Sequence, residues 1–162
     1  MSRKTSSKSS ANGKLTDRDW DRETSSRIVS LFRKRLLRDG KASLARRILF
    51  ESFQQIEEIT EKRGVDVLCE AILNVQPIVE VKPQRRGGSV FQVPVEVSPE
   101  RGILIALSWI AQSARQRAGR GMVAKLTAEI IDASKKTGNA VRKKEELHKM
   151  AEANKALSHY RF

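Results

Sequence analysis

The sequence predicts a mainly α-helical protein: a six-helix bundle with a two-stranded β-hairpin that protrudes between the third and fourth helices. Apolar residues recur at helical spacing before residue 76 and again after residue 98. Between about residues 78 and 97 the apolar period changes to two, and a glycine pair lies in the middle. The 162 residues, of which 39% are hydrophobic, are enough for one domain around one core.

Three helices are expected before the hairpin. The first begins near Thr24 to Ser26, which can cap it, and ends at Asp39-Gly40. The second runs from about residue 41 to 62, and Gly64 closes it where helices favour a left-handed residue. The third covers about 65–75 and ends before Pro77. The apolar stripe of the second helix is Leu44, Ile48, Leu49, Phe53, Ile56 and Ile59.

The hairpin is expected at about 78–97. Residues 78–82 and 90–97 alternate in polarity, and Pro83 to Ser89 form a basic, glycine-containing connection between them. Pro94 cannot donate to a ladder, so its strand must be an edge strand. A ribbon of two strands is marginal alone. Its base should therefore lean on helices while its basic tip projects.

Three more helices follow the hairpin. Ser98-Pro99 starts the fourth, and Gly119 and Gly121 flank the turn after it. The fifth is expected at about 122–136, ending before Gly138. The sixth, at about 140–157, is rich in Ala and charged residues, so it should bury only one narrow stripe.

The chain carries a large excess of positive charge, with 32 Lys and Arg against 19 Asp and Glu, a net charge of +13. The positive charges of such a protein repel one another unless a polyanion neutralises them, and nucleic acid is the leading candidate for that polyanion. A flexible basic arm is expected at residues 1–23, ahead of an RNA-binding domain at 24–162. Acid-poor clusters lie at 27–47, at the hairpin tip, at 115–125 and at 135–144, mainly at helix ends and loops. Cations in loops can follow the irregular backbone of folded RNA.

Other chemistries have little support in the sequence. The lone cysteine and two histidines have no zinc-site spacing, and no phosphate-binding loop is present. We therefore expect no catalytic residue, no metal and no cofactor. No apolar run reaches the roughly 20 residues that span a bilayer, so no membrane partner is expected. Aromatic residues are only 5% and fall on helix stripes, so base stacking is not expected.

Four stretches resemble the small-subunit ribosomal protein seven family of bacterial type. They are DGKASLARRILFESF at 39–53, VQPIVEVKPQRRGGSVFQVPVEV at 75–97, ALSWIAQSARQR at 106–117 and AVRKKEELHKMAEANKALSHYRF at 140–162. The resemblance implies a non-enzymatic protein that binds the 3′ major domain of small-subunit ribosomal RNA directly and nucleates assembly of the subunit head. It also implies that the hairpin lies near the exit-site transfer RNA and the messenger path. Ribosomal proteins nine and eleven are the neighbours implied.

The residues expected to contact RNA come from the arm, the basic clusters and the positions that match the family: Arg3, Lys4, Lys8, Arg33, Lys34, Lys41, Arg46, Arg85, Arg86, Arg115, Arg117, Arg120, Arg142, Lys143 and Lys144. The run RKKEE at 142–146 is similar to plastid and cyanobacterial members. A ribosome of the plastid stroma is therefore favoured, with the bacterial cytoplasm as the alternative.

Two functions of other classes stay open. One is a DNA-binding regulator with a helix in the major groove, and the other is a nuclease or RNA-modifying enzyme that uses His148.

Overall fold

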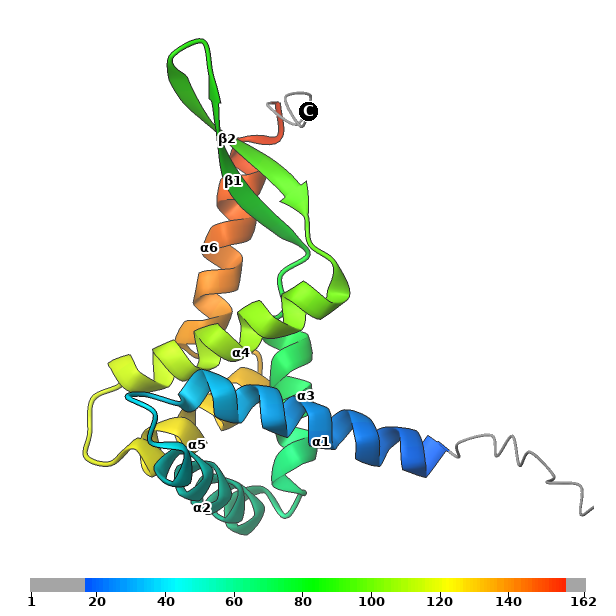
Figure 1. Ribbon diagram of the computed structural model, residues 1–162, viewed down its shortest axis with the longest axis vertical. Helices are drawn as coiled ribbons and strands as arrows, with labels where there is room; N and C mark the ends of the chain where they lie inside the picture. Colours follow the sequence, from blue (N-terminus) through cyan, green and yellow to red (C-terminus); the bar gives the residue numbers. More distant parts are fainter. Residues whose placement is uncertain (1–16, 157–162) are drawn as a thin grey trace, which may run out of the picture.

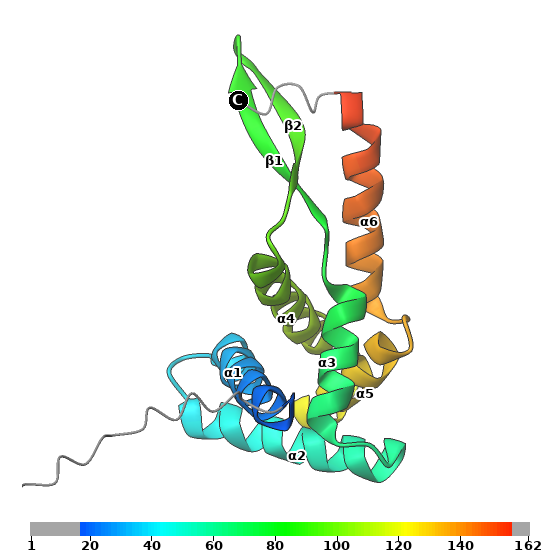
Figure 2. The same ribbon diagram turned by 90° about the vertical axis from the view of Figure 1, so that its right-hand side faces the viewer.

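The computed structural model describes residues 17–156, without the side chains of residues 17–25 and of Arg86. This part of the chain forms six helices and one hairpin, so the predicted fold class is confirmed. The elements are α1 (Asp17–Leu36), α2 (Ala42–Thr60), α3 (Gly64–Val75), β1 (Val79–Arg86), β2 (Ser89–Glu96), α4 (Pro99–Gln116), α5 (Met122–Ser134) and α6 (Asn139–Ala153). Figures 1 and 2 show α1 to α5 gathered in one body, from which the hairpin and α6 extend in the same direction.

The hydrophobic core lies where α1 to α5 converge, and each of these five helices contributes a side chain with no solvent exposure. Burying side chains of this size stabilises the fold by about 1.5–3 kcal/mol each. The core is completed at one end by Ala140 and Val141 from the start of α6. The largest fully buried apolar side chains of the helices include Phe32, Ile56, Leu68, Leu107, Ile110, Leu126 and Ile130.

The first helix begins earlier than the sequence suggested. α1 starts at Asp17, ahead of the caps expected at Thr24 to Ser26, so residues 17–23 of the predicted arm are helical. This segment is charged and lacks an apolar stripe, which is why periodicity gave no signal there. Arg3, Lys4 and Lys8 lie outside the described residues.

The buried face of α2 differs from the predicted stripe. The buried residues are Ala45, Leu49, Ser52 and Ile56, whereas Leu44 and Ile59 are exposed. The small side chains of Ala45 and Ser52 allow this face to pack on α5, and the Ser52 hydroxyl is satisfied because it donates to the Ile48 carbonyl at 2.7 Å. A stripe drawn through the large apolar residues alone was therefore rotated about the helix axis relative to the face that is buried.

Gly64 has a different role from the predicted one. The left-handed residue that ends α2 is Glu61, with a φ of 56°, and Gly64 instead begins α3. A Cβ on Gly64 would lie 2.9 Å from the Cα of Phe53 and 2.8 Å from its Cβ. Gly64 is therefore required for the close approach of α3 to α2.

The hairpin lies where it was expected, but its first strand is longer and its turn tighter than the sequence suggested. β1 and β2 pair antiparallel from Val79 opposite Glu96 to Arg86 opposite Ser89, which leaves only Gly87 and Gly88 in the turn. Both glycines have positive φ, 56° and 85°. A two-residue turn of this kind matches the twist of the strands and requires positive φ at both positions.

The base of the hairpin is attached to α6 and α4. The Ile78 backbone N–H donates to His148 Nε2 on α6 at 3.2 Å. Glu80 on β1 forms ion pairs with Lys82 at 3.0 Å and with Arg101 on α4 at 3.1 Å. Within α6 only Ala140, Val141 and Ala151 are buried among the described residues, which fits the narrow stripe predicted for this helix.

Candidate nucleic-acid interface

The first basic cluster lies on the pair of helices α1 and α2. Arg33 and Lys34 are in the last turns of α1, Lys41 immediately precedes α2, and Arg46 is in the second turn of α2. All four side chains are exposed, and none forms an ion pair with another described residue. The tight turn through Asp39 and Gly40, both with positive φ, brings the two helices together.

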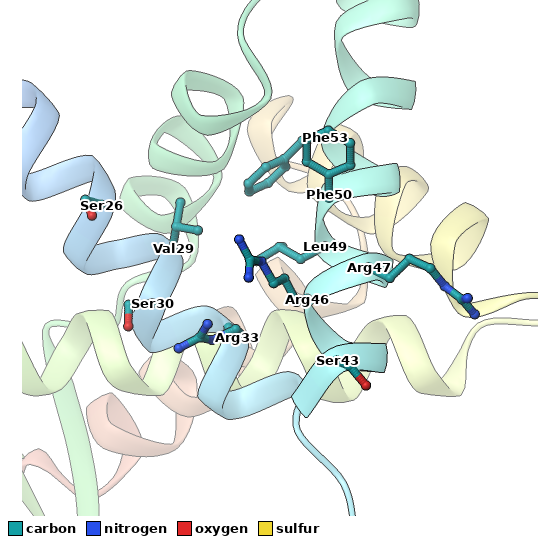
Figure 3. Close-up of a pocket in the computed structure, with 10 residues that line it drawn as sticks. All are labelled: Ser26, Val29, Ser30, Arg33, Ser43, Arg46, Arg47, Leu49, Phe50 and Phe53. Carbon is teal, nitrogen blue, oxygen red and sulfur yellow. The ribbon is translucent and has the colours of Figure 1, made fainter. Parts of the chain in front are cut away.

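A groove of about 800 Å³ runs between α1 and α2. Figure 3 shows the residues that line it, with the Arg46 guanidinium directed into the space between the two helices. Arg33 lies across from it on α1. The wall also carries Phe50 and Phe53, so this groove combines cations with aromatic rings. Among the residues whose side chains the structure describes, no acidic one lines it.

A second pocket lies between the α1–α2 turn and the C-terminal end of α4. Its lining includes Arg38, Lys41 and Arg115, with Asp39 as the one acid. Arg115 is exposed, and its Nη2 donates to the carbonyls of Arg35 and Leu36 at 3.2 and 3.4 Å. These carbonyls are at the C-terminal end of α1, where the helix dipole favours a cation. Arg115 therefore attaches α4 to α1 and still presents positive charge to solvent.

Arg117 differs from the free cation that the sequence suggested. Its Nε donates to Glu129 Oε2 at 2.5 Å, and its Nη2 forms an ion pair with Asp132. Burial by itself lowers the pKa of Arg117, but the hydrogen bonds that it donates to Asp132 and Glu129 outweigh this effect and raise the pKa. The fully buried Glu129 also accepts a hydrogen bond from the Ala140 N–H at 2.9 Å. Arg117 therefore holds α4 to α5 and, through Glu129, to α6. Its charge is already paired with two carboxylates, which makes it a weaker candidate for RNA contact than Arg115.

The basic residues at the start of α6 are partly engaged by the body. Lys144 donates to the Asn74 carbonyl at 2.8 Å, which is at the end of α3, and Lys143 donates to Gln112 Oε1 at 3.0 Å. Neither lysine is paired with a carboxylate of the described residues, so both keep their positive charge. Arg142 is exposed, as is Arg120 in the turn between α4 and α5.

The hairpin tip carries Arg85 and Arg86 on its last two rungs, opposite Val90 and Ser89. Arg85 is exposed.

Residues without a positive charge also line the α1–α2 groove, and the charge pattern of the sequence did not point to them. Ser26, Ser30, Ser43 and Phe50 line the α1–α2 groove, and each is distant in sequence from at least one of the others. The signal in the sequence was that Phe50 stands one helical turn after Arg46, so the two share a face of α2.

The described residues contain no group of three or more His, Cys, Asp or Glu able to hold a metal ion. None of the helices in this part of the chain is long and apolar enough to cross a membrane.

Comparison with known proteins agrees with this arrangement. Residues 3–155 match the family described as Ribosomal protein S7p/S5e. The chain is 51% identical to "Small ribosomal subunit protein uS7c" of Tupiella akineta, over 85% of this chain and 88% of that protein. It is 53% identical to uS7 of the cyanobacterium Acaryochloris marina and 52% identical to uS7c of Ostreococcus tauri, each over the same shares of the two chains. The chain therefore belongs to the S7p/S5e family of small-subunit ribosomal proteins, which are structural and not catalytic components of the ribosome.

Proposed function

We propose that this chain binds small-subunit ribosomal RNA directly, at the 3′ major domain, and that this binding nucleates assembly of the subunit head. The observation that carries the proposal is the set of exposed cations without an ion-pair partner among the described residues. Those that the sequence predicted to contact RNA come from the α1–α2 region, the hairpin tip, the end of α4 with the turn after it, and the first turn of α6. They are Arg33, Lys34, Lys41, Arg46, Arg85, Arg115, Arg120 and Arg142.

The distribution of these cations favours folded RNA over a DNA duplex. A major-groove reader presents one helix with several side chains aimed at base edges. Here the cations lie at helix ends, in turns and on a ribbon tip, which suits several phosphates of an irregular RNA surface. Phosphate neutralisation with counterion release is then the source of most of the affinity.

The remaining parts of the proposal concern neighbours and compartment. The hairpin extends away from the body (Figure 1), so its tip can reach the exit-site transfer RNA and the messenger path. We propose ribosomal proteins nine and eleven as neighbours and the basic arm with Arg3, Lys4 and Lys8 as an additional RNA contact. Relatives from chloroplasts and cyanobacteria support a plastid or bacterial origin, and we favour a ribosome of the plastid stroma.

The test is a binding measurement with the full chain at several salt concentrations. Three ligands of matched length are compared: a fragment of the 3′ major domain, a fragment of another ribosomal RNA domain and duplex DNA. We expect the first to bind at least about tenfold more tightly than the others, with an affinity that falls steeply with salt. Equal competition by duplex DNA would contradict the proposal and favour a DNA-binding regulator.

A further inference from the structure

The α1–α2 groove contains an exposed aromatic ring that the core does not use. Phe50 is 63% exposed, and among the large hydrophobic side chains that the described residues expose it is the only aromatic one. The buried face of α2 passes through Leu49 and Ile56, so Phe50 stands beside that face and not on it. Its exposure therefore gains nothing for the packing of this chain.

The cations around this ring are placed to hold a phosphate. Arg46 is one helical turn before Phe50 on the same face of α2, and its guanidinium enters the groove. Arg33 faces it from α1, and Ser30 and Ser43 line the same groove. The groove therefore offers positive charge and polar side chains around Arg46 and Arg33, and a flat apolar surface at Phe50.

We infer that this groove takes one unstacked nucleotide of single-stranded RNA, with its base on the Phe50 ring and its phosphate at Arg46 and Arg33. Every base has a flat π-face that stacks on an aromatic side chain, and an arginine fork matches a phosphate. This inference rests on the proposed RNA binding and adds a base-stacking site that composition alone argued against.

Other occupants fit the groove less well. Residues 1–14 of the chain contain four cations and no acid, so they would repel the arginines that line it. An acidic protein segment satisfies the charge but has no particular need for an exposed aromatic surface. A nucleotide uses both features at once.

Substitutions at Phe50 test the stacking. We expect Phe50→Leu in the full chain to weaken binding to the 3′ major domain fragment by roughly fivefold to a hundredfold. Because no charge is lost, the weakening should be equal at every salt concentration. Phe50→Tyr, which keeps the ring, should bind like the wild type. Ile59→Ala removes another exposed apolar side chain of α2, outside the groove, and should leave the affinity unchanged.

Substitutions at two adjacent arginines test the phosphate contact. Arg46→Gln should flatten the salt dependence by roughly one unit in the log–log slope. Arg47 is the matched control: it also lines the groove, but its guanidinium points away from α1 and pairs with Glu51 at 3.7 Å. Arg47→Gln should change the slope less than Arg46→Gln does.

The outcomes separate this inference from the proposed function. Tight, salt-dependent binding that Phe50→Leu does not alter would overturn the nucleotide site while the RNA-binding function stands. A Phe50→Leu variant that binds RNA normally but fails to co-assemble with ribosomal proteins would overturn it in favour of a protein occupant. A wild-type chain without preference for the ribosomal fragment would refute the proposed function itself. Thermal unfolding monitored by circular dichroism confirms that each variant is folded.

Discussion

Arg117 offers the sharpest test of how this fold is held together. In Arg117→Gln the fully buried carboxylate of Glu129 loses its partner and keeps only the Ala140 N–H as a donor. Breaking a buried ion pair by removing one partner costs about 3–5 kcal/mol. We expect the lower end, about 3 kcal/mol, because the backbone donor remains and the Arg117 side chain is 23% exposed.

Urea unfolding at neutral pH measures this loss, and two variants control it. Arg115→Gln removes an arginine two positions away whose bonds to backbone carbonyls are exposed or only part-buried, so its cost should stay near 1 kcal/mol or less. The double variant Arg117→Gln with Glu129→Gln removes the unpaired charge and should recover most of the stability. If Arg117→Gln costs no more than Arg115→Gln, or if the double variant is no better than the single one, the ion pair does not hold the helices as described.

Three further predictions follow from other contacts. Gly64→Ala should destabilise the protein by about 1–3 kcal/mol in urea unfolding, because the added Cβ meets the backbone of Phe53, whereas the same change at Gly102 meets only the flexible side chain of Gln76 and should cost less. Burial and, to a smaller extent, Lys144 lower the pKa of His148, so stability should fall as the pH drops below about 6.5. His148→Asn should show less of this loss between pH 7.5 and 5.5. In RNA binding, Arg115→Gln should flatten the log–log salt slope by about one unit while Arg117→Gln leaves it unchanged.

The sequence predicted the order and type of the elements because periodicity reports which face of an element is buried. The change of period at residue 78 located the hairpin, and the Gly87-Gly88 pair marked its turn. Periodicity failed where small residues replaced large ones. Ala45 and Ser52 carry the buried face of α2, and a hydrophobic stripe drawn through large side chains passed over them.

Whether a basic side chain is exposed and unpaired could be predicted where the charge pattern is local, but not where it depends on residues distant in sequence. Lys41, Arg46 and Arg85 lie in acid-poor stretches and are exposed. Arg117 also lies in an acid-poor stretch, but Glu129 and Asp132 of α5, which are 12 and 15 residues further along the chain, form ion pairs with it. Counting charges along the chain cannot detect a carboxylate that another helix brings into contact.

The way in which the hairpin is attached determines how a force on its tip is transmitted to the rest of the protein. Its root is fixed to α6 at Ile78 and to α4 at Glu80, whereas a Cβ at Gly87 or Gly88 would meet no atom within 4 Å. The hairpin is thus fixed at its base, and its tip has no contact of this kind with the body. A force on the tip therefore reaches the body through α4 and α6, whereas α2 contacts neither strand of the hairpin in the described part of the chain.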